Sequence, residues 1–245
     1  MKISQKLLPI VLMATLLMAG CQKETFVSLS GRQDTHTMQA VDFSAISVHR
    51  NIKVVLSDTI DHIEVTADAN LIDYVALDQV GNELVVHYNN VTWNGNTNTT
   101  VIMPMPKDLE TYNGSGTSEI WVSPIIENDL VEIRLSGSAF MNAQIKAQNA
   151  IINLSGDSKA GITGLSDNFD VQFSGSSQLA ALQANGTYPF AAGRVYGSLS
   201  GSSLLTVHCD GEIDCSISGS SCLRYTGNAD THKCALTGLS SLIAD

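Results

Sequence analysis

Apolar and polar residues alternate around a short motif that recurs through the second half of the chain. The motif has Ser or Thr, then Gly, then two residues that are mostly small, and its seven glycines are Gly116, Gly137, Gly156, Gly175, Gly201, Gly219 and Gly238. Successive glycines are separated by 21, 19, 19, 26, 18 and 19 residues. A period this regular indicates a repeat protein in which each copy is one structural unit.

Positions counted from each glycine keep their polarity from copy to copy. Residues four and six after the glycine are apolar, those three before it are mostly polar, and those two before it include Leu135, Leu154, Phe173, Leu199, Ile217 and Leu236. A period of two is that of a β-strand with one buried face. Nineteen residues cannot bury this face alone, but coils stacked about 4.8 Å apart can. The pattern predicts an all-β right-handed parallel β-helix over residues 111–245, in which those six side chains line one buried stripe.

Residues 41–110 carry shorter strand-like runs without the Ser-Gly motif. The runs cover residues 46–48, 52–56, 63–67, 84–88 and 101–103. Gly81-Asn82 separates two of them as a turn would, residues 71–77 suit one short helical turn, and residues 92–100 suit a loop. We expect these N-terminal strands to continue the coil or to cap it.

The N-terminus has the features of a secretory leader. Lys2 and Lys6 precede an apolar run over residues 7–19, which is too short for a membrane-spanning helix. Residues 17–21, Leu-Met-Ala-Gly-Cys, resemble a bacterial lipobox, which implies cleavage after residue 20 and a lipid anchor on Cys21. The alternative is an ordinary signal peptide followed by an incidental cysteine. Residues 21–40 are predicted to be a flexible tether. We expect an outer-membrane lipoprotein. The sequence is compatible with a location on the cell surface and with one on the periplasmic face of that membrane.

The composition excludes some partners. The formal net charge is -11 and only 15% of residues are charged, so the chain has no basic surface for nucleic acid. The polar surface must be built from Ser, Thr, Asn and Gln.

The repeat suggests two candidate ligand surfaces. The residue before each glycine is Ser or Thr, which predicts a column of hydroxyls that includes Ser136, Ser155, Ser174, Ser200 and Ser218. Such a column could bind a glycan, or its hydroxyls could simply cap the turn backbone. The 26-residue spacing predicts a bulging loop with Tyr188 and Phe190, whose rings could contact a sugar or fold over the interior.

Maturation leaves four cysteines: Cys209, Cys215, Cys222 and Cys234. Cys215 and Cys234 share a phase in adjacent coils and form a candidate disulfide, although parallel side chains can also remain buried thiols. No C-x-x-C pair or His pair at helical spacing is present, so we expect neither a metal nor a cofactor. The repeat-region aspartates fall at different phases, apart from Asp170 and Asp214, which share an outward column. We therefore expect no catalytic residues.

Four N-terminal blocks followed by the Ser-Gly repeats resemble the family described as putative auto-transporter adhesin, head GIN domain. The blocks cover residues 43–46, 51–56, 63–71 and 81–86, and the resemblance extends over about residues 41–245. The sequence departs from the family pattern at His49-Arg50 and in the 26-residue repeat. The resemblance implies a secreted or lipid-anchored bacterial protein with a β-helical region and an adhesive role, and it carries over no catalytic residues.

From these observations we expect a non-enzymatic envelope protein that is anchored in the membrane through Cys21 and binds a glycan, a polymer or another cell surface. Two alternatives remain open. A polysaccharide-acting enzyme would need clustered carboxylates or a bound calcium ion. An envelope scaffold would self-associate through exposed coil ends.

Overall fold

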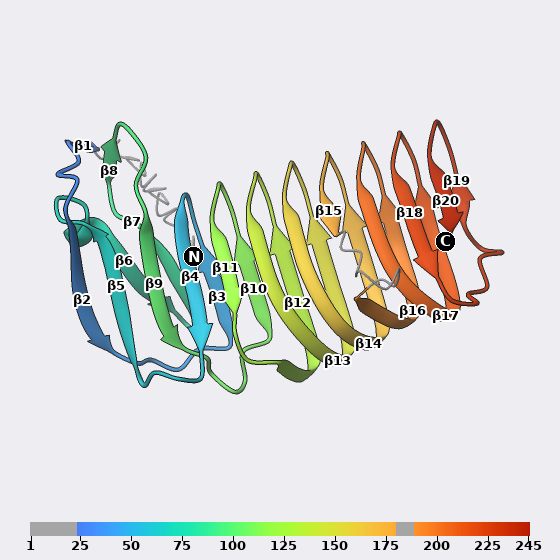
Figure 1. Cartoon of the computed structure of the whole chain (residues 1–245), viewed down its shortest axis with the longest axis horizontal. Coiled ribbons are helices and arrows are strands. Elements are labelled where there is room, and N and C mark those ends of the chain that lie inside the picture. The colour runs from blue at the N-terminus through green and yellow to red at the C-terminus, as the bar shows by residue number, and fades with distance from the viewer. Residues whose placement is uncertain (1–23, 180–188) are drawn as a thin grey trace, which may run out of the picture.

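Strands stacked along one long axis make up most of the molecule (Figure 1). The computed structural model describes residues 24–179 and 189–245, and this part of the chain contains strands and one short 3-10 turn but no α-helix. Pairing is parallel throughout the repeat, and antiparallel pairs occur near the N-terminal end. The fold is therefore all-β, as the alternation predicts, with a mixed sheet.

Each Ser-Gly motif forms a corner between two strand segments that belong to different faces of the stack. We call the segments that enter the corners, such as residues 149–154, the pre-corner sheet, and those that leave them, such as residues 140–147, the post-corner sheet. The repeat strands are β10 (Thr111–Gly114), β11 (Glu119–Val122), β12 (Ile126–Leu135), β13 (Phe140–Leu154), β14 (Lys159–Phe173), β15 (Gln178–Leu179), β16 (Phe190–Leu199), β17 (Leu204–Ile217), β18 (Cys222–Thr226), β19 (Ala235–Leu236) and β20 (Ser241–Ala244).

The predicted buried stripe is present in register. Leu135, Leu154, Phe173, Leu199, Ile217 and Leu236 pair successively across β12, β13, β14, β16, β17 and β19. The first five are at most 2% exposed, whereas Leu236 is 46% exposed. Leu236 thus departs from the prediction because, among the described residues, no further coil pairs with its strand on the outer side.

The corner glycines have a conformation that other residues rarely adopt. All seven have φ between 70° and 77°, in the left-handed region. They are also stacked directly on one another: a Cβ added to Gly156 would lie 2.6 Å from the carbonyl oxygen of Gly137. Both the backbone angle and the close stacking explain why the motif keeps glycine in every copy.

The N-terminal strands continue the stack, but not in chain order. They are β1 (Thr25–Val27), β2 (Gln33–Gln39), β3 (Ala45–Val48), β4 (Ile52–Ser57), β5 (His62–Asp68), β6 (Val75–Val80), β7 (Glu83–Tyr88), β8 (Val91–Trp93) and β9 (Thr99–Pro104), with the 3-10 turn η1 at Ile72–Tyr74. The coil of β3 and β4 pairs on one side with β10 and β11 and on the other with β7 and β9. The first coil in sequence is therefore the second in space.

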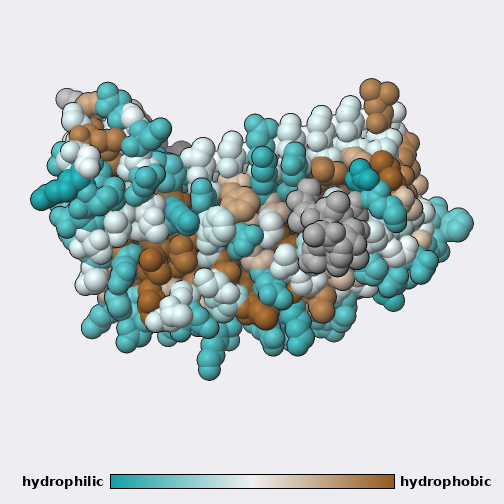
Figure 2. Space-filling view, in the orientation of Figure 1, coloured by the Kyte–Doolittle hydropathy of each residue, from teal (hydrophilic) through white to brown (hydrophobic). Residues whose placement is uncertain are grey.

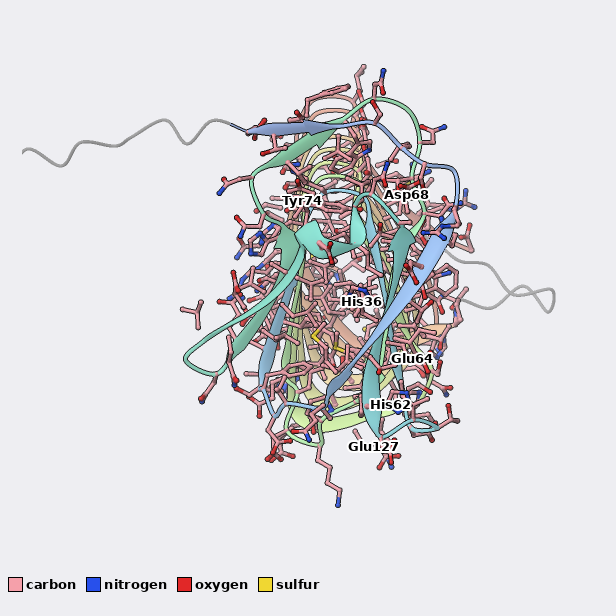
Figure 3. All side chains as sticks on the ribbon, turned by 90° about the vertical axis from the view of Figure 1, so that its left-hand side faces the viewer. His36, His62, Glu64, Asp68, Tyr74 and Glu127 are labelled. Carbon is pink, nitrogen blue, oxygen red and sulfur yellow. The ribbon has the colours of Figure 1, made fainter. Side chains whose placement is uncertain are left out.

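Antiparallel strands close the N-terminal end of the stack. β5 pairs with β9 and β2 with β5, while β6 pairs with β7. Figure 3 looks onto this end, with β2 lying across the front and η1 above it. These antiparallel pairs make the sheet mixed, while the parallel pairs of β3 with β7 and of β4 with β9 continue the coil.

The segment expected to be a flexible tether instead contains β1 and β2. All seven residues of β2 are exposed, so the strand has no apolar period to reveal it and is held mainly by backbone pairing with β5. The carboxylate of Asp68, which is 4% exposed, fixes the preceding turn by accepting hydrogen bonds from the backbone amides of Ser30 at 3.0 Å and Gly31 at 2.8 Å. The lipidated Cys21 of the prediction lies outside the described residues.

The long repeat is described on both sides of residues 180–188. Leu179 pairs with Ala160, and Phe190 pairs with Gly164. The predicted bulging loop as far as Tyr188 lies outside the described residues.

Candidate functional site

A groove runs along the pre-corner sheet beside the row of serines. It has a volume of about 480 Å³ and is lined by equivalent residues of successive coils. Four of the five predicted serines, Ser136, Ser155, Ser174 and Ser200, contribute to its wall, and Ser218 continues their row in the next coil. The repeat therefore builds a grooved surface whose chemistry recurs at the strand spacing of about 4.8 Å.

The serine hydroxyls are oriented by the coil that precedes each of them. Ser200 Oγ donates to the carbonyl of Phe173 at 3.2 Å, Ser218 Oγ to that of Leu199 at 3.4 Å, and the hydroxyls of Ser136 and Ser155 make the same contact at 3.5 Å. These bonds support the turn-capping interpretation. They also leave the oxygen lone pairs as acceptors, so the hydroxyl column offers acceptors to a ligand rather than donors.

A column of amides and one guanidinium lies next to the serines. Asn113, Arg134, Asn153 and Gln172 pair in register on β10, β12, β13 and β14. Asn113 Nδ2 donates to Ser47 Oγ at 3.1 Å, and Arg134 donates to Glu132. The Oδ1 atoms of Asn113 and Asn153 are buried without a hydrogen-bond partner, which is unfavourable unless a ligand or water supplies a donor.

The sequence pattern placed this column on the outward polar face of the repeat. Its shared phase, three residues before each glycine, was the available signal. The burial of the two amide oxygens could not be predicted from the pattern, because it depends on how the neighbouring side chains pack.

His49 ends the serine row at the N-terminal side of the groove. It occupies the position of the corner serine in its coil, and its Nδ1 lies 2.7 Å from Ser115 Oγ. Burial lowers the pKa of His49, the neighbouring His87 lowers it further, and Glu83 acts in the opposite direction. The imidazole is therefore neutral at pH 7 and adds an uncharged polar group to the groove.

The predicted aromatic loop surface is only partly described. Tyr188 lies outside the described residues. Phe190 is fully buried and packs edge-to-face on Phe169, with ring centroids 4.8 Å apart. Phe190 is therefore not an exposed contact residue: its ring fills the interior where the chain rejoins the stack.

The candidate disulfide is not formed. Cys215 and Cys234 lie opposite each other in adjacent coils, as predicted, but both are free thiols. The Cys234 thiol is directed to the carbonyl oxygen of Ile213 at 3.0 Å. Burial, together with the charges of the neighbouring Cys234 and Asp214, raises the pKa of Cys215 to about 12, so this thiol stays protonated.

The carboxylates of the repeat do not gather in the groove. Asp170 and Asp214 share the predicted outward column, and Tyr196 lies between them. Among the residues that line the groove there is no Asp or Glu. In the described parts of the chain, no group of three or more His, Cys, Asp or Glu side chains is placed to hold a metal ion.

Stacked, in-register coils with a repetitive polar groove define an all-β repeat protein. The model of the family described as putative auto-transporter adhesin, head GIN domain, matches residues 42–229, and the chain belongs to this family. An adhesin family indicates a cell-surface or envelope protein. Within residues 24–179 and 189–245, no helix is long and apolar enough to cross a membrane.

Solved structures share the fold. A crystal structure of a putative adhesin from Bacteroides fragilis NCTC 9343 is 16% identical, with a TM-score of 0.72, and the match covers 89% of this chain and 100% of that one. A putative adhesin from Parabacteroides merdae ATCC 43184 is 17% identical, with a TM-score of 0.67 and coverage of 90% and 99%. A protein from Parabacteroides distasonis ATCC 8503 described as a putative lipid binding protein is 17% identical, with a TM-score of 0.66 and coverage of 90% and 100%. No curated protein matches the sequence significantly.

Proposed function

We propose that this protein is a non-enzymatic, lipid-anchored adhesin of the outer membrane, and that its right-handed parallel β-helix binds an extended, hydroxyl-rich polymer such as a glycan along the groove. Family membership supports the adhesive role. The lipobox-like residues before Cys21 support the anchor.

The observation that carries the proposal is the column of acceptors beside the corners. The serine hydroxyls direct their protons to the backbone, and the Oδ1 atoms of Asn113 and Asn153 are buried without partners. A ligand rich in O–H groups donates to the serine oxygens and accepts hydrogen bonds from the neighbouring Arg134 and Gln172 side chains. Because the acceptors recur in every coil, a polymer gains contacts along its length.

Replacing one amide of the groove tests the proposal. Asn153→Leu keeps the approximate side-chain size and removes the acceptor, so we expect the affinity for a bound polysaccharide to fall at least about tenfold. The matched control is Gln144→Leu, which makes a similar exchange at an exposed position of the post-corner sheet. Glycan-array binding that persists unchanged in Asn153→Leu would show that the groove is not the binding surface.

The non-enzymatic part of the proposal has its own readout. Each polysaccharide that binds is incubated with the full-length protein, and its chain length is followed by size-exclusion chromatography. We expect no shortening. A new reducing end or a lyase product would favour the enzyme alternative.

The anchor is tested through Cys21. Cells fed a labelled fatty acid should incorporate the label into the wild-type chain and not into Cys21→Ala. Protease digestion of intact cells then separates the two faces of the outer membrane, because only a surface-exposed chain is degraded.

A second candidate function is a self-associating scaffold. Leu236, Leu239 and Ile243 are 46%, 84% and 37% exposed in and around β19 and β20, and Figure 2 shows apolar surface at this end of the stack. Concentration-dependent association that is lost in Leu239→Ser would favour this function.

A further inference from the structure

Two aromatic side chains lie next to each other on the outer face of the post-corner sheet. Trp121 on β11 and Phe140 on β13 are half-buried, with ring centroids 5.3 Å apart and ring planes tilted by 53°. They come from neighbouring coils, because Glu119 pairs with Phe140 and Trp121 with Asn142. Figure 2 looks onto this face of the molecule. The groove lies on the other sheet, beyond the corners.

These rings are not required to fill the interior. The other two ring pairs in the described residues each include a buried ring: Tyr88 packs with Trp93, and Phe169 with Phe190. Trp121 and Phe140 instead take outward phases, five and three residues after a corner glycine. A half-exposed aromatic pair on the outer face of a sheet indicates a contact surface.

The Trp121 ring is held in place from two sides. Its Nε1 donates to Glu119 at 2.8 Å, and the Lys53 ammonium lies 4.7 Å from the ring centroid. The indole orientation is thus fixed before any ligand arrives, which reduces the entropy lost on binding.

The surface beside Phe140 is flat. Asn142 pairs with Gly161, which has no side chain, and the Asn142 amide donates to the Gly161 carbonyl at 3.2 Å. A Cβ at Gly161 would lie 2.9 Å from that amide nitrogen. The glycine therefore lets the amide lie down against the sheet beside the Phe140 ring.

Polar groups of several kinds surround a hollow on the corner side of Phe140. The hollow has a volume of about 450 Å³ and is lined by Ser138, Ala139, Asp157, Lys159, Ser176 and Gln178 together with Phe140. Lys159 pairs with Phe140 and Gln178 with Lys159, so they form one column. The hollow thus places three polar groups beside the apolar ring: the Asp157 carboxylate accepts hydrogen bonds, the Lys159 ammonium donates them, and the Gln178 amide can donate and accept. The one negative and the one positive charge balance.

From this combination we infer a second binding site that takes the ring of a neutral sugar. A pyranose has a flat face of C–H groups, which are attracted to the negative face of an aromatic ring, and a rim of hydroxyls that donate to Asp157 and exchange hydrogen bonds with Gln178. The inference deepens the proposed glycan binding by naming the sugar class and a separate location, and it does not depend on the groove.

Tryptophan emission of the full-length chain tests the site. The chain has two tryptophans, so Trp93→Phe leaves Trp121 as the reporter. Methyl glycosides of glucose, galactose, mannose and N-acetylglucosamine are titrated separately. We expect at least one to cause a saturable change in emission, with an affinity in the millimolar range typical of a single small ligand, and Phe140→Ala to weaken it at least tenfold.

Matched variants separate ring stacking from folding. Phe140→Tyr keeps the aromatic face and should retain binding, whereas Phe140→Leu keeps an apolar cross-strand residue and should lose it. Asp157→Asn changes only an exposed carboxylate and should weaken binding severalfold. Circular dichroism and thermal melting confirm that each variant is folded.

Two results would overturn the inference: no saturable change with any of the four glycosides, or equal affinity in Phe140→Leu and the parent. The groove variant Asn153→Leu distinguishes this site from the proposed function. If Asn153→Leu loses the polymer but still binds the glycoside, both proposals stand. If polymer binding is unaffected by Asn153→Leu while Phe140→Leu abolishes glycoside binding, the groove proposal fails and the sugar site stands.

Discussion

Arg50 and Gly116 occupy equivalent corner positions in adjacent coils, and both have left-handed backbone angles, with φ of 62° and 72°. The backbone of Arg50 lies directly under Gly116, whose added Cβ would be 3.0 Å from Arg50 Cα. The corner geometry therefore continues into a coil whose sequence lacks the Ser-Gly motif. Arg50 keeps this angle while its guanidinium donates to the Val91 carbonyl at 2.8 Å and lies over Trp93.

The corner glycines should tolerate no side chain. In Gly156→Ala, the left-handed φ and a Cβ placed 2.6 Å from the Gly137 carbonyl oxygen both oppose folding, so we expect the free energy of unfolding to fall by roughly 3 kcal/mol or more. Gly81→Ala is the control, because Gly81 has φ of 62° and nothing within 4 Å of its Cβ position, and it should lose only about 1 kcal/mol. Urea denaturation measures both. Equal losses would mean that stacking at the corner adds nothing.

The Asn153 amide in the groove should lower the stability of the folded protein. Because Asn153 Oδ1 is buried without a partner, Asn153→Leu removes an unsatisfied polar atom, and we expect it to raise the free energy of unfolding by about 1 kcal/mol. Thermal and urea unfolding check this. A destabilised Asn153→Leu would contradict the picture of an acceptor kept for a ligand.

Asp68 should make the N-terminal cap sensitive to acid. Burial opposes ionisation of Asp68, but backbone hydrogen bonds from Ser30, Asn70 and Gly31 outweigh it and lower its pKa below the ordinary 3.8. A carboxyl with a lowered folded-state pKa contributes stability above its unfolded pKa and loses it as the pH falls through the folded value. Asp68→Asn should lower the free energy of unfolding by about 1–3 kcal/mol at pH 7 and flatten the acid dependence.

The control for Asp68 is Asp73→Asn, which changes an exposed carboxylate in η1 and should have little effect. Hydrogen exchange localises the result: amides of β2 and the preceding turn should lose protection in Asp68→Asn. Uniform loss of protection through the whole stack would argue against a local role in the cap.

Two histidines should respond to pH in opposite directions. His49 has a lowered pKa, chiefly because of burial, so the unfolded chain binds its proton more readily and the folded state loses stability as the pH falls below about 6.5. The pKa of His62 is raised by its hydrogen bonds to Asp61 and Glu64, and Figure 3 shows His62 and Glu64 side by side on β5. The stabilising contribution of His62 is present below about 6.5 and disappears as the pH rises through its raised value.

Urea titrations at several pH values between about 5 and 8 separate the two histidines. His49→Gln should flatten the loss of stability toward acid, and His62→Gln should steepen it. The same direction of change in both variants would show that the local environments of these residues do not control their protonation.

The cysteines should differ in reactivity. Burial raises the pKa of Cys215 to about 12, and the thiolate is the reactive form, so we expect no alkylation of Cys215 in the folded protein at pH 8. Cys222 is half-exposed and should react first. Mass spectrometry of alkylated peptides, with and without denaturant, gives the order, and rapid labelling of Cys215 in native protein would contradict its buried position.

The repeat could be predicted because its information is local. A glycine with a left-handed φ and apolar residues at fixed distances from it were enough to place Leu135, Leu154, Phe173, Leu199 and Ile217 in one buried stripe. The serine column was equally visible, and four of its five predicted members line the same groove because equivalent positions of in-register coils must lie above one another.

What the sequence did not reveal depends on contacts between distant segments. β2 has no apolar period because it covers an end rather than a core, so its pairing with β5 could not be read from its residues. Phe190 was predicted to lie on an exposed loop as a contact residue. It is buried instead, because its ring packs against Phe169. The unsatisfied oxygen of Asn153 reflects side-chain packing around one amide, for which the repeat pattern has no signal.

The β3–β4 coil lies between two coils that come later in the chain. Its strands therefore complete their pairing only after both of those coils have been synthesised. A polypeptide that emerges amino end first presents these strands with one edge bare until about residue 104 has followed them, and with the other edge bare until about residue 122. Bare edges recruit other extended chains, and pairing over such sequence distances is slow. A chain of this kind needs protection until those edges are covered. The downstream repeats, which pair with near neighbours in sequence, are the part best suited to assemble first and act as a template for the rest.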